Sequence, residues 1–495
     1  MNRAEKRRQE KLAKKQANKR ANKRANNQAF THSDAEERAI DVALEHHQAG
    51  RLAEAEAMYR KVLSTNPNHP MALHYLGLVA HQMGDADVAV ELIGRAVAVL
   101  PDYVEAYANL ANMLVQLERG VEAEAACRHA LAQEPNRART HYHLAKALEL
   151  QDRPAEALES YRRTVALDPQ AAHAHSDLGR SLNALGQFGE ALESFQKAVA
   201  LDPASALFHN NLGSALHMLK RFDAALEAFT KALSLDAGDP MAQQNMANVL
   251  RDMGRVDEAV ACLETLLAAH PDLASARHNL NALKGHTPDA APAQYVEELF
   301  DHFAHRFDGE LQDKLQYAVP TLLKKRVLEV AASQAPFGTV VDLGCGTGLV
   351  GEAFRDVAGT LIGVDLSKNM VREAQRKGVY DQLLIDGLVD GLGQVEGPVD
   401  LFVCADVFIY VGALDRTFGA VKEKARPGSL LVFSTEHTDA TDTFVLQDTS
   451  RYAHAKAYIE AQAQAHGFEV VHFETIDLRK EKDGWIPGAV YMLKA

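Results

Sequence analysis

Three alternate glycines, Gly344, Gly346 and Gly348, follow an apolar run and an acid, and they could hold a small ligand against the backbone. Glycine is needed where the chain turns with positive φ or lies against a ligand without a Cβ in the way. A dinucleotide loop has the spacing G-x-G-x-x-G, which directs a helix N-terminus at a pyrophosphate. Here the third glycine comes one residue too early and Leu349 occupies its slot, so the loop suits a neutral nucleoside that carries an amino acid.

A carboxylate stands 21 residues after Gly344, at Asp365, where the strand-like segment Leu361 to Asp365 ends. An acid at the end of the second strand of a nucleotide-binding unit can accept hydrogen bonds from both ribose hydroxyls, and it opposes a 2'-phosphate. The glycine loop and Asp365 together therefore predict a nucleoside site and disfavour NADP.

Residues Val340 to Val350 and Ile362 to Ser367 resemble motifs I and II of class I S-adenosylmethionine-dependent methyltransferases, and the likeness extends over about residues 296 to 495. It implies that the following residues contact S-adenosylmethionine: Asp342, Gly344, Cys345, Gly346, Gly348, Asp365, Leu366, Asp386 and Asp406. By this likeness Asp342 orients the methionine part, Asp365 holds the ribose and Leu366 covers the adenine. Asp386 accepts the adenine amine, although its Asp-Gly order departs from the usual Gly-Asp.

A sulfonium is already a strong electrophile, so the main task of such an enzyme is to hold a nucleophile in line with the methyl group. A general base adds to the rate where the acceptor must lose a proton. The candidates for this base are Asp406, Tyr410, His437 and His454. Each is expected at or after a strand end, on the side where such sheets bind ligands. For each of them a hydrogen-bonded structural role is the alternative.

Strand-like and helical segments alternate after residue 296, which is typical of a mostly parallel sheet covered by helices. The expected strands are Thr339 to Leu343, Leu361 to Asp365, Leu383 to Ile385, Leu401 to Ala405, Leu430 to Thr435 and Glu469 to Thr475. The sequence therefore predicts an α/β Rossmann-like domain of about seven strands over residues 296–495. A linker is expected over residues 286–295, where prolines and alanines gather.

A 34-residue period governs the chain from residue 36 to about residue 271. Seven copies begin at residues 36, 70, 104, 138, 172, 206 and 240, and the twentieth residue of every copy is alanine. The eighth residue is always Ala or Gly, and six copies end in proline. Small residues at two fixed points let a pair of helices cross closely, and proline ends the second helix.

This pattern resembles the tetratricopeptide repeat, which implies an all-α solenoid over residues 35–285, with a capping helix near Leu273 to Leu283. By the same likeness the groove of the solenoid binds a protein or peptide. Asparagines recur at the sixth and ninth positions of the copies: Asn109, Asn211, Asn245, Asn112 and Asn248. Their amides could pair with the backbone of an extended peptide, or they could be scattered residues on a wet helical face.

The combination of both regions resembles a group of bacterial predicted methyltransferases fused to tetratricopeptide repeats. Six residues become candidates for a lid or an acceptor pocket by this likeness: Phe303, Phe307, Tyr317, Arg451, Tyr452 and His454. It implies an S-adenosylmethionine-dependent methyltransferase whose arm recruits a protein or peptide substrate or partner. The alternative is an interaction scaffold in which the repeats act and the C-terminal domain binds the cofactor in a non-catalytic or regulatory role.

Charge is distributed unevenly along the 495 residues, whose net charge is −14. Residues 1 to 24 carry eleven Lys or Arg and two Glu, a net of +9, so the remainder carries −14 − 9 = −23. Residues 1–34 are therefore expected to form a basic disordered tail. Such a tail could contact nucleic acid or an anionic surface weakly, or it could serve solubility without a dedicated partner.

The four cysteines lie far apart and form no CxxC pair, which indicates neither a disulfide framework nor a metal site. No apolar run approaches the roughly 18 residues that span a bilayer, and the N-terminus lacks the apolar stretch of a secretory signal. These features predict a cytoplasmic protein without membrane insertion and without a bound metal.

Overall fold

The computed structural model describes residues 34–304, 307–309, 311, 315–331, 334–481 and 484–495. The chain forms two compact units, Met1–Ala174 and His175–Ala495. The basic tail predicted for residues 1–34, with its contact to nucleic acid, lies outside the described residues except for Asp34. Within the described ranges, no helix has both the length and the apolar character that crossing a bilayer requires.

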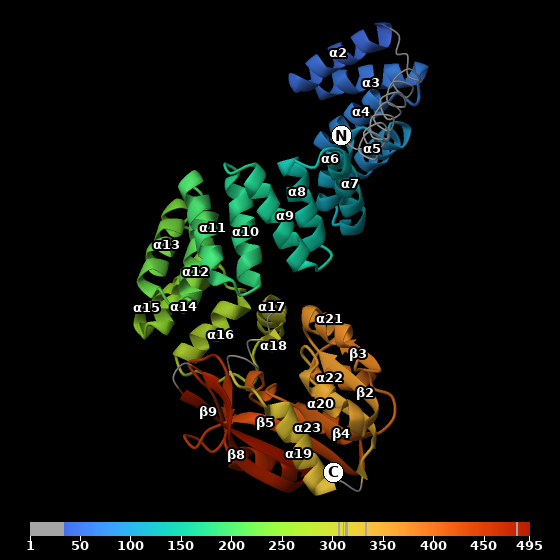
Figure 1. Ribbon diagram of the computed structural model, residues 1–495. Helices are drawn as coiled ribbons and strands as arrows, with labels where there is room; N and C mark the ends of the chain where they lie inside the picture. The colour runs from blue at the N-terminus through green and yellow to red at the C-terminus, as the bar shows by residue number, and fades with distance from the viewer. Residues whose placement is uncertain (1–33, 305–306, 310, 312–314, 332–333, 482–483) are drawn as a thin grey trace, which may run out of the picture. The chain divides into compact units, whose positions relative to one another are not determined.

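Consecutive helices of the first unit pack in pairs, one pair for each 34-residue copy (Figure 1). The pairs are α2 (Asp34–Gln48) with α3 (Leu52–Thr65), α4 (Pro70–Gln82) with α5 (Ala86–Val99), α6 (Val104–Gln116) with α7 (Gly120–Gln133), and α8 (Ala138–Glu149) with α9 (Pro154–Leu167). The eighth and twentieth residues meet where two helices cross. In the second copy, a Cβ added to Gly77 would lie 3.0 Å from the carbonyl oxygen of Ala89, which is itself fully buried. A larger residue at either point would separate the helices.

The second unit continues the same pattern as far as the α/β domain (Figure 1). Its pairs are α10 (Ala172–Ala184) with α11 (Phe188–Leu201), α12 (Ala206–Met218) with α13 (Phe222–Leu235), and α14 (Pro240–Asp252) with α15 (Val256–Ala269), and α16 (Ala274–Leu283) follows as a single helix. At the eighth position of the sixth copy, a Cβ on Gly213 would lie 2.7 Å from Cε1 of Phe229. The fully buried Phe229 ring therefore occupies the space that glycine leaves.

Polar side chains 35 residues apart bond between neighbouring copies in both units. One row joins the sixth position of a copy to the fifth position of the copy before it: Asn109 to His74 (3.0 Å), Asn211 to Ser176 (3.1 Å) and Asn245 to Asn210 (3.1 Å). A second row joins the twelfth position to the thirteenth position of the next copy: His47 to Gln82 (3.1 Å), His81 to Gln116 (2.7 Å) and His217 to Asp252 (2.8 Å). The three sixth-position asparagines, which were candidates for binding a peptide, thus donate hydrogen bonds between adjacent copies.

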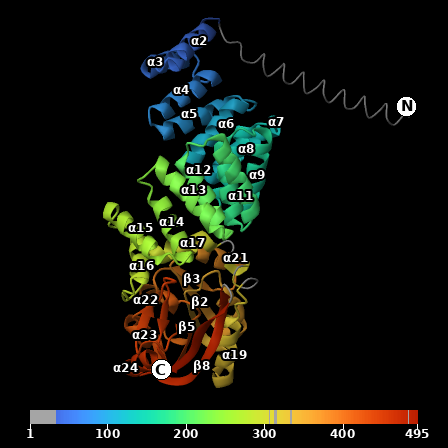
Figure 2. The same ribbon diagram turned by 90° about the vertical axis from the view of Figure 1, so that its left-hand side faces the viewer.

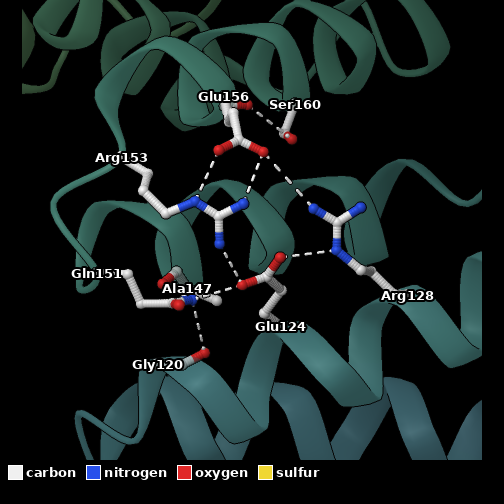
Figure 3. A network of polar contacts seen from close by, with 8 residues as sticks. All are labelled: Gly120, Glu124, Arg128, Ala147, Gln151, Arg153, Glu156 and Ser160. Atoms are coloured by element: carbon white, nitrogen blue, oxygen red, sulfur yellow. Dashed lines mark hydrogen bonds and ion pairs between the residues drawn. The ribbon is translucent and has the colours of Figure 1, made fainter.

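An ion-pair network reinforces the contact between the third and fourth copies (Figure 3). Arg153 at the start of α9 donates from Nη1 to Glu124 at 2.6 Å and makes a two-pronged contact with Glu156 at 2.7 Å. Arg128 donates to the other oxygen of Glu124 at 2.7 Å, and the amide of Gln151 donates to Glu124 at 2.8 Å. Glu124 is the least exposed member, so its carboxylate is the centre of the network.

The C-terminal part of the second unit is a nine-stranded sheet with helices on both faces (Figures 1 and 2). The strands are β1 (Phe337–Leu343), β2 (Ala358–Asp365), β3 (Gln382–Ile385), β4 (Val399–Cys404), β5 (Ala425–His437), β6 (Phe444–Leu446), β7 (Tyr452–His454), β8 (Glu469–Glu481) and β9 (Gly484–Lys494). The helices are α17 (Ala293–Phe303), α18 (Phe307–Gly309), α19 (Val319–Ala331), α20 (Leu349–Phe354), α21 (Lys368–Lys377), α22 (Leu388–Gln394), α23 (Asp415–Lys424) and α24 (Lys456–Ala465). The order β3-β2-β1-β4-β5 is parallel throughout, which confirms the expected mostly parallel α/β fold.

The strands are apolar on both faces, because helices cover both. Val341 and Phe402 face one layer, where they pack in one buried cluster with Phe418 of α23 and residues of α22 and α24. Val340 faces the other layer and packs with Leu323 of α19 and residues of α20. Asp342 lies two residues after Val340, so its side chain points to the same face of the sheet and places an acid in an otherwise apolar layer.

Strand β5 is longer than its neighbour β4, and four further strands, β6 to β9, join the sheet through it. Leu430 to Glu436 pair with β9 on one edge, and β9 continues to β8, both antiparallel. On the other edge β4 ends opposite Phe433, and β7 takes its place against Glu436 and His437. The β6–β7 hairpin therefore lies just beyond the carboxyl end of β4. The strands expected from the sequence included β8, as Glu469 to Thr475, but not β6, β7 or β9.

Helix α16 ends the solenoid and packs on the β6–β7 hairpin. Ala282 forms a small buried cluster with Leu446 and Tyr452. Nε2 of His278 lies 3.0 Å from the carbonyl oxygen of Ser450, and the Ser450 hydroxyl donates to Oδ1 of Asn279 at 2.8 Å. The last repeat and the α/β domain thus share a buried polar and apolar contact.

Candidate functional site

A cavity of about 340 Å³ opens at the carboxyl ends of the parallel strands, where the loops after β1, β2, β3 and β4 meet. Ligands bind at this edge in open α/β sheets because the strand-to-helix loops converge there. The walls are mainly apolar, and they include α17 and the segment predicted as a linker. The polar groups among its lining residues include Thr347, Asp365, Asp386, Asp406, Tyr317, Tyr410, Arg451 and Arg479.

The glycine loop after β1 forms one side of the cavity. Gly344 has a φ of +73°, and a Cβ there would lie 2.3 Å from Cγ2 of Val407. Gly346 has a φ of +51°, and among the described residues a Cβ there would meet only Cε1 of Phe307, at 3.8 Å. Gly344 is therefore required for packing, whereas Gly346 leaves space on the cavity side for a ligand.

Asp365 ends β2 and faces the cavity beside this loop. Its Oδ2 accepts a hydrogen bond from the backbone N–H of Gly346 at 2.8 Å, and its Oδ1 accepts one from Ser367 at 2.9 Å. Burial raises the pKa of this carboxyl, and the backbone N–H groups oppose that rise. Each carboxylate oxygen can accept more than one hydrogen bond, so Asp365 can still receive two hydroxyl donors.

Asp342 lies on β1, fully buried, and does not line the cavity. The Tyr380 hydroxyl donates to its Oδ2 at 2.6 Å, whereas Oδ1 has no hydrogen-bond partner among the described residues. Burial, together with the nearby charge of Asp365, raises the pKa of Asp342 to about 7. Tyr380 also accepts the backbone N–H of Gly351 at 3.1 Å, so it links the strand to the helix after the glycine loop.

Asp386 follows β3 and closes the cavity beyond Asp365. Its Oδ1 accepts the N–H of Gly387 at 2.8 Å, and its Oδ2 accepts the side-chain amide of Gln394 at 2.7 Å. The side chains of Leu366 and Leu388 line the same part of the cavity. A flat aromatic ring fits between apolar side chains of this kind, with the carboxylate at its edge.

Two aspartates hold α17 and α18 over the cavity. Asp301 accepts hydrogen bonds from the Ser367 hydroxyl and from the N–H of Asn369, the latter at 3.2 Å. Asp308 contacts the Thr347 hydroxyl and pairs with Lys377 at 2.6 Å. Phe300 and Phe307 line the cavity from these helices, as a lid would. Phe303, the other lid candidate, lies in α17, and its side chain falls outside the described residues.

A buried charge cluster forms the opposite side of the cavity, next to β4 and β5. Asp406 has a φ of +56°; its Oδ1 accepts the Ser434 hydroxyl at 2.8 Å and its Oδ2 accepts Nη1 of Arg479 at 2.8 Å. Arg479 also donates to Glu436, and Nε of Arg451 lies 2.8 Å from the same carboxylate. Two guanidinium groups and two carboxylates thus balance each other.

The remaining sequence candidates separate into two groups. Tyr317 and Tyr410 line the cavity, and burial raises the pKa of each phenol above its usual range. His437 does not line the cavity; its Nε2 lies 3.2 Å from Asp439. His454 is fully buried, its Nε2 lies 3.0 Å from the carbonyl oxygen of Gly412, and burial lowers its pKa to about 4.

Tyr452, another candidate for the acceptor pocket, is buried in the contact with α16 and does not line the cavity. The residues of the site that were not expected from the sequence include Tyr380, Glu436 and Arg479. None belongs to a local motif, and Arg479 lies 73 residues beyond its partner Asp406. The only signal for Glu436 and Arg479 is a charged residue within an otherwise strand-like segment.

Comparison with known families divides the chain in the same way. Residues 303–475 match the family described as a methyltransferase domain. Tetratricopeptide-repeat families match residues 46–114, 80–148, 138–163, 176–240 and 216–283.

Individual relatives cover only parts of the chain. The ubiquinone biosynthesis O-methyltransferase of Methylococcus capsulatus is 30% identical over 149 residues, 28% of this chain and 60% of that protein. A putative methyltransferase of Geobacillus sp. (strain WCH70) is 25% identical over 156 residues, 30% of this chain and 62% of that protein. The chain thus spans about three fifths of the length of these relatives. The solved structure of pilF from Pseudomonas aeruginosa is 19% identical, with a TM-score of 0.40, and covers 43% of this chain and 98% of its own.

Proposed function

Since this chain carries tetratricopeptide repeats followed by a methyltransferase domain, we propose that it transfers a methyl group from S-adenosylmethionine to an acceptor bound at the carboxyl edge of the sheet. The observation that carries the proposal is one continuous cavity, which reaches from Asp386 and Asp365 past Gly346 to Asp406 and Tyr410. Such a cavity can hold a nucleoside at one end and an acceptor at the other.

The residues at the first end suit S-adenosylmethionine. Asp365 is available to both ribose hydroxyls, and the leucines at 366 and 388 are available to the two faces of an adenine. Gly346 leaves the space that a side chain would fill. Asp342 does not line the cavity, so we expect it to orient the methionine part only indirectly, through the end of β1 that carries the glycine loop.

S-adenosylmethionine supplies an electrophilic methyl group when it is bound. The chain supplies orientation and a dry cavity, which can account for roughly 7 to 11 kcal/mol of barrier reduction. Tyr317 and Tyr410 keep their protons at neutral pH, because burial raises their pKa values, so they serve as hydrogen-bond donors rather than bases. Asp406 is bonded to Ser434 and Arg479, which makes it a positioning residue.

We further propose that the repeats bind a protein or peptide and so bring the enzyme to its substrate or partner. The alternative is a scaffold whose α/β domain binds the cofactor without transfer. Incubation of the full chain with labelled S-adenosylmethionine and cell lysate distinguishes the two. Methyl transfer into an acceptor supports the enzyme, whereas cofactor binding without any transfer supports the scaffold.

Calorimetry with S-adenosylmethionine tests the cofactor site directly. Asp365→Ala should weaken binding by about 100-fold or more, because two hydrogen bonds to a charged group are worth about 3 kcal/mol or more together. Asp365→Asn should retain part of the affinity. Asp390→Ala changes an exposed acid of α22 and serves as the control, with unchanged affinity. Equal affinity for S-adenosylmethionine in the unsubstituted chain and in all three variants would refute the proposal that Asp365 binds the ribose.

A further inference from the structure

The acceptor end of the cavity carries two arginines in mainly apolar surroundings. Arg451 and Arg479 both line the cavity, with side chains 18% and 4% exposed. A cation is costly to bury unless a partner compensates it. Glu436 is 2% exposed and Asp406 is 14% exposed, so the carboxylates that compensate the arginines are themselves withdrawn from solvent.

The two arginines and the carboxylates of the cofactor end lie at different positions along the same edge of the sheet. Asp386 and Asp365 follow β3 and β2, whereas Arg451 precedes β7 and Arg479 lies on β8, on the other side of β1 and β4. Neighbouring strands lie about 4.8 Å apart, so the two groups face different parts of a bound pair of ligands. The first end therefore presents carboxylates to a ligand, whereas the lining of the other end presents two guanidinium groups and one carboxylate, Asp406, and favours an anion.

The backbone of Arg451 is held firmly. Ser450, the residue before it, has a φ of +63° and is 2% exposed. Its carbonyl and hydroxyl contact His278 and Asn279 of α16, and the N–H of Gln447 donates to the carbonyl of Arg451 at 2.8 Å. A guanidinium on such a fixed turn is preorganised, so little entropy is lost when an anion binds it.

On the basis of the proposed function, we propose that the methyl acceptor carries a carboxylate, which Arg451 binds at the cavity wall with Arg479 behind it. A planar guanidinium matches a carboxylate with two parallel hydrogen bonds. Val296, Phe300 and Ile409 line the cavity as well and give the body of the acceptor an apolar environment. A cationic acceptor such as a lysine side chain would meet a lining with two guanidinium groups and one carboxylate, Asp406, which is a net positive charge.

Binding of benzoate and benzamide to the full chain saturated with S-adenosylhomocysteine tests this inference, because the two probes differ in charge and hardly in shape. Benzoate should bind about tenfold more tightly than benzamide. Arg451→Gln should abolish that preference. Glu436→Gln should increase it, because the substitution removes a competing carboxylate and leaves both guanidiniums. Arg376→Gln, an exposed position on α21, is the control and should leave the preference unchanged.

The outcomes separate this inference from the proposed function. Equal affinity for benzoate and benzamide in a protein that binds S-adenosylhomocysteine would overturn the carboxylate subsite alone. A preference that survives Arg451→Gln, or that fails to rise in Glu436→Gln, would show that the charge cluster is only structural and would also overturn it. Absence of S-adenosylhomocysteine binding in the unsubstituted chain would remove the proposed function and this inference with it.

Discussion

Replacing Asp342 with asparagine should make the α/β domain more stable at alkaline pH. Burial raises the pKa of this carboxyl from its ordinary 3.8 to about 7. Between these two values the folded chain binds more protons than the unfolded chain, so stability falls as pH rises and levels off above about pH 7. Asparagine cannot ionise and can still accept the Tyr380 hydroxyl, so the variant should lose this pH dependence.

The size of the effect follows from the same two pKa values. One pH unit corresponds to about 1.36 kcal/mol for a single proton. Between pH 5 and pH 8.5 the folded carboxyl passes through its pKa of about 7, so the unsubstituted chain should lose about 3 kcal/mol relative to Asp342→Asn. This figure is an upper estimate, because a relaxed or hydrated site would reduce the penalty.

Urea unfolding followed by tryptophan emission provides the assay. Trp485 is the single tryptophan of the chain and lies on β9, so its emission reports the α/β domain and not the repeats. Unfolding of both proteins is measured at pH 5 and pH 8.5. Asp381→Asn is the matched control: Arg355 and a backbone N–H lower the pKa of Asp381, so its stability difference should not change over this range. A difference for Asp342→Asn that is the same at both pH values would refute the reasoning.

Two further substitutions test the loop and the contact with the last helix. Gly344→Ala should destabilise the domain by about 2 to 4 kcal/mol, because alanine would be strained at positive φ and would collide with Val407. Gly393→Ala in helix α22 is the control and should be neutral or slightly stabilising, and thermal unfolding followed by tryptophan emission compares the two variants. Ser450→Ala should cost about 1 to 3 kcal/mol, since it leaves Oδ1 of buried Asn279 without its donor, and a melt unchanged within error would contradict that contact.

Much of the architecture could be predicted because the relevant signals are local. The small residues at the eighth and twentieth positions recur in every copy, and each reflects a contact inside one helix pair, as between Gly77 and Ala89. The glycine loop and Asp365 are similarly local, since one hydrogen bond between Gly346 and Asp365 joins two neighbouring strand ends. The sequence therefore predicts the fold class and the closeness of the glycine loop to Asp365.

The opposite end of the cavity, beside Asp406 and Arg479, could not be predicted in the same way, because its groups come together only through the tertiary fold. Glu436 lies on the extension of β5, and Arg479 lies on β8, which reaches β5 only through β9. His454 was a candidate because of its residue type, but its Nε2 lies 3.0 Å from the carbonyl oxygen of Gly412 and the side chain does not line the cavity. Nothing in the spacing of these residues distinguishes a buried structural histidine from one that faces a ligand.

The 35-residue bonds between copies have a consequence for how long the arm can be. Each bond crosses a single boundary between copies, and the partners occupy equivalent positions in successive copies. Deleting residues 206–239 as one block would bring Asn245 to the present position of Asn211, opposite Ser176, and the same amide-to-hydroxyl bond could form again. In this row a whole copy can therefore be lost and the bond re-formed, whereas deletion of part of a copy would shift the two partners out of register. Helix α16 packs on the β6–β7 hairpin. Loss or gain of a whole copy would therefore change the length of the solenoid, while the contacts between α16 and the hairpin would stay the same.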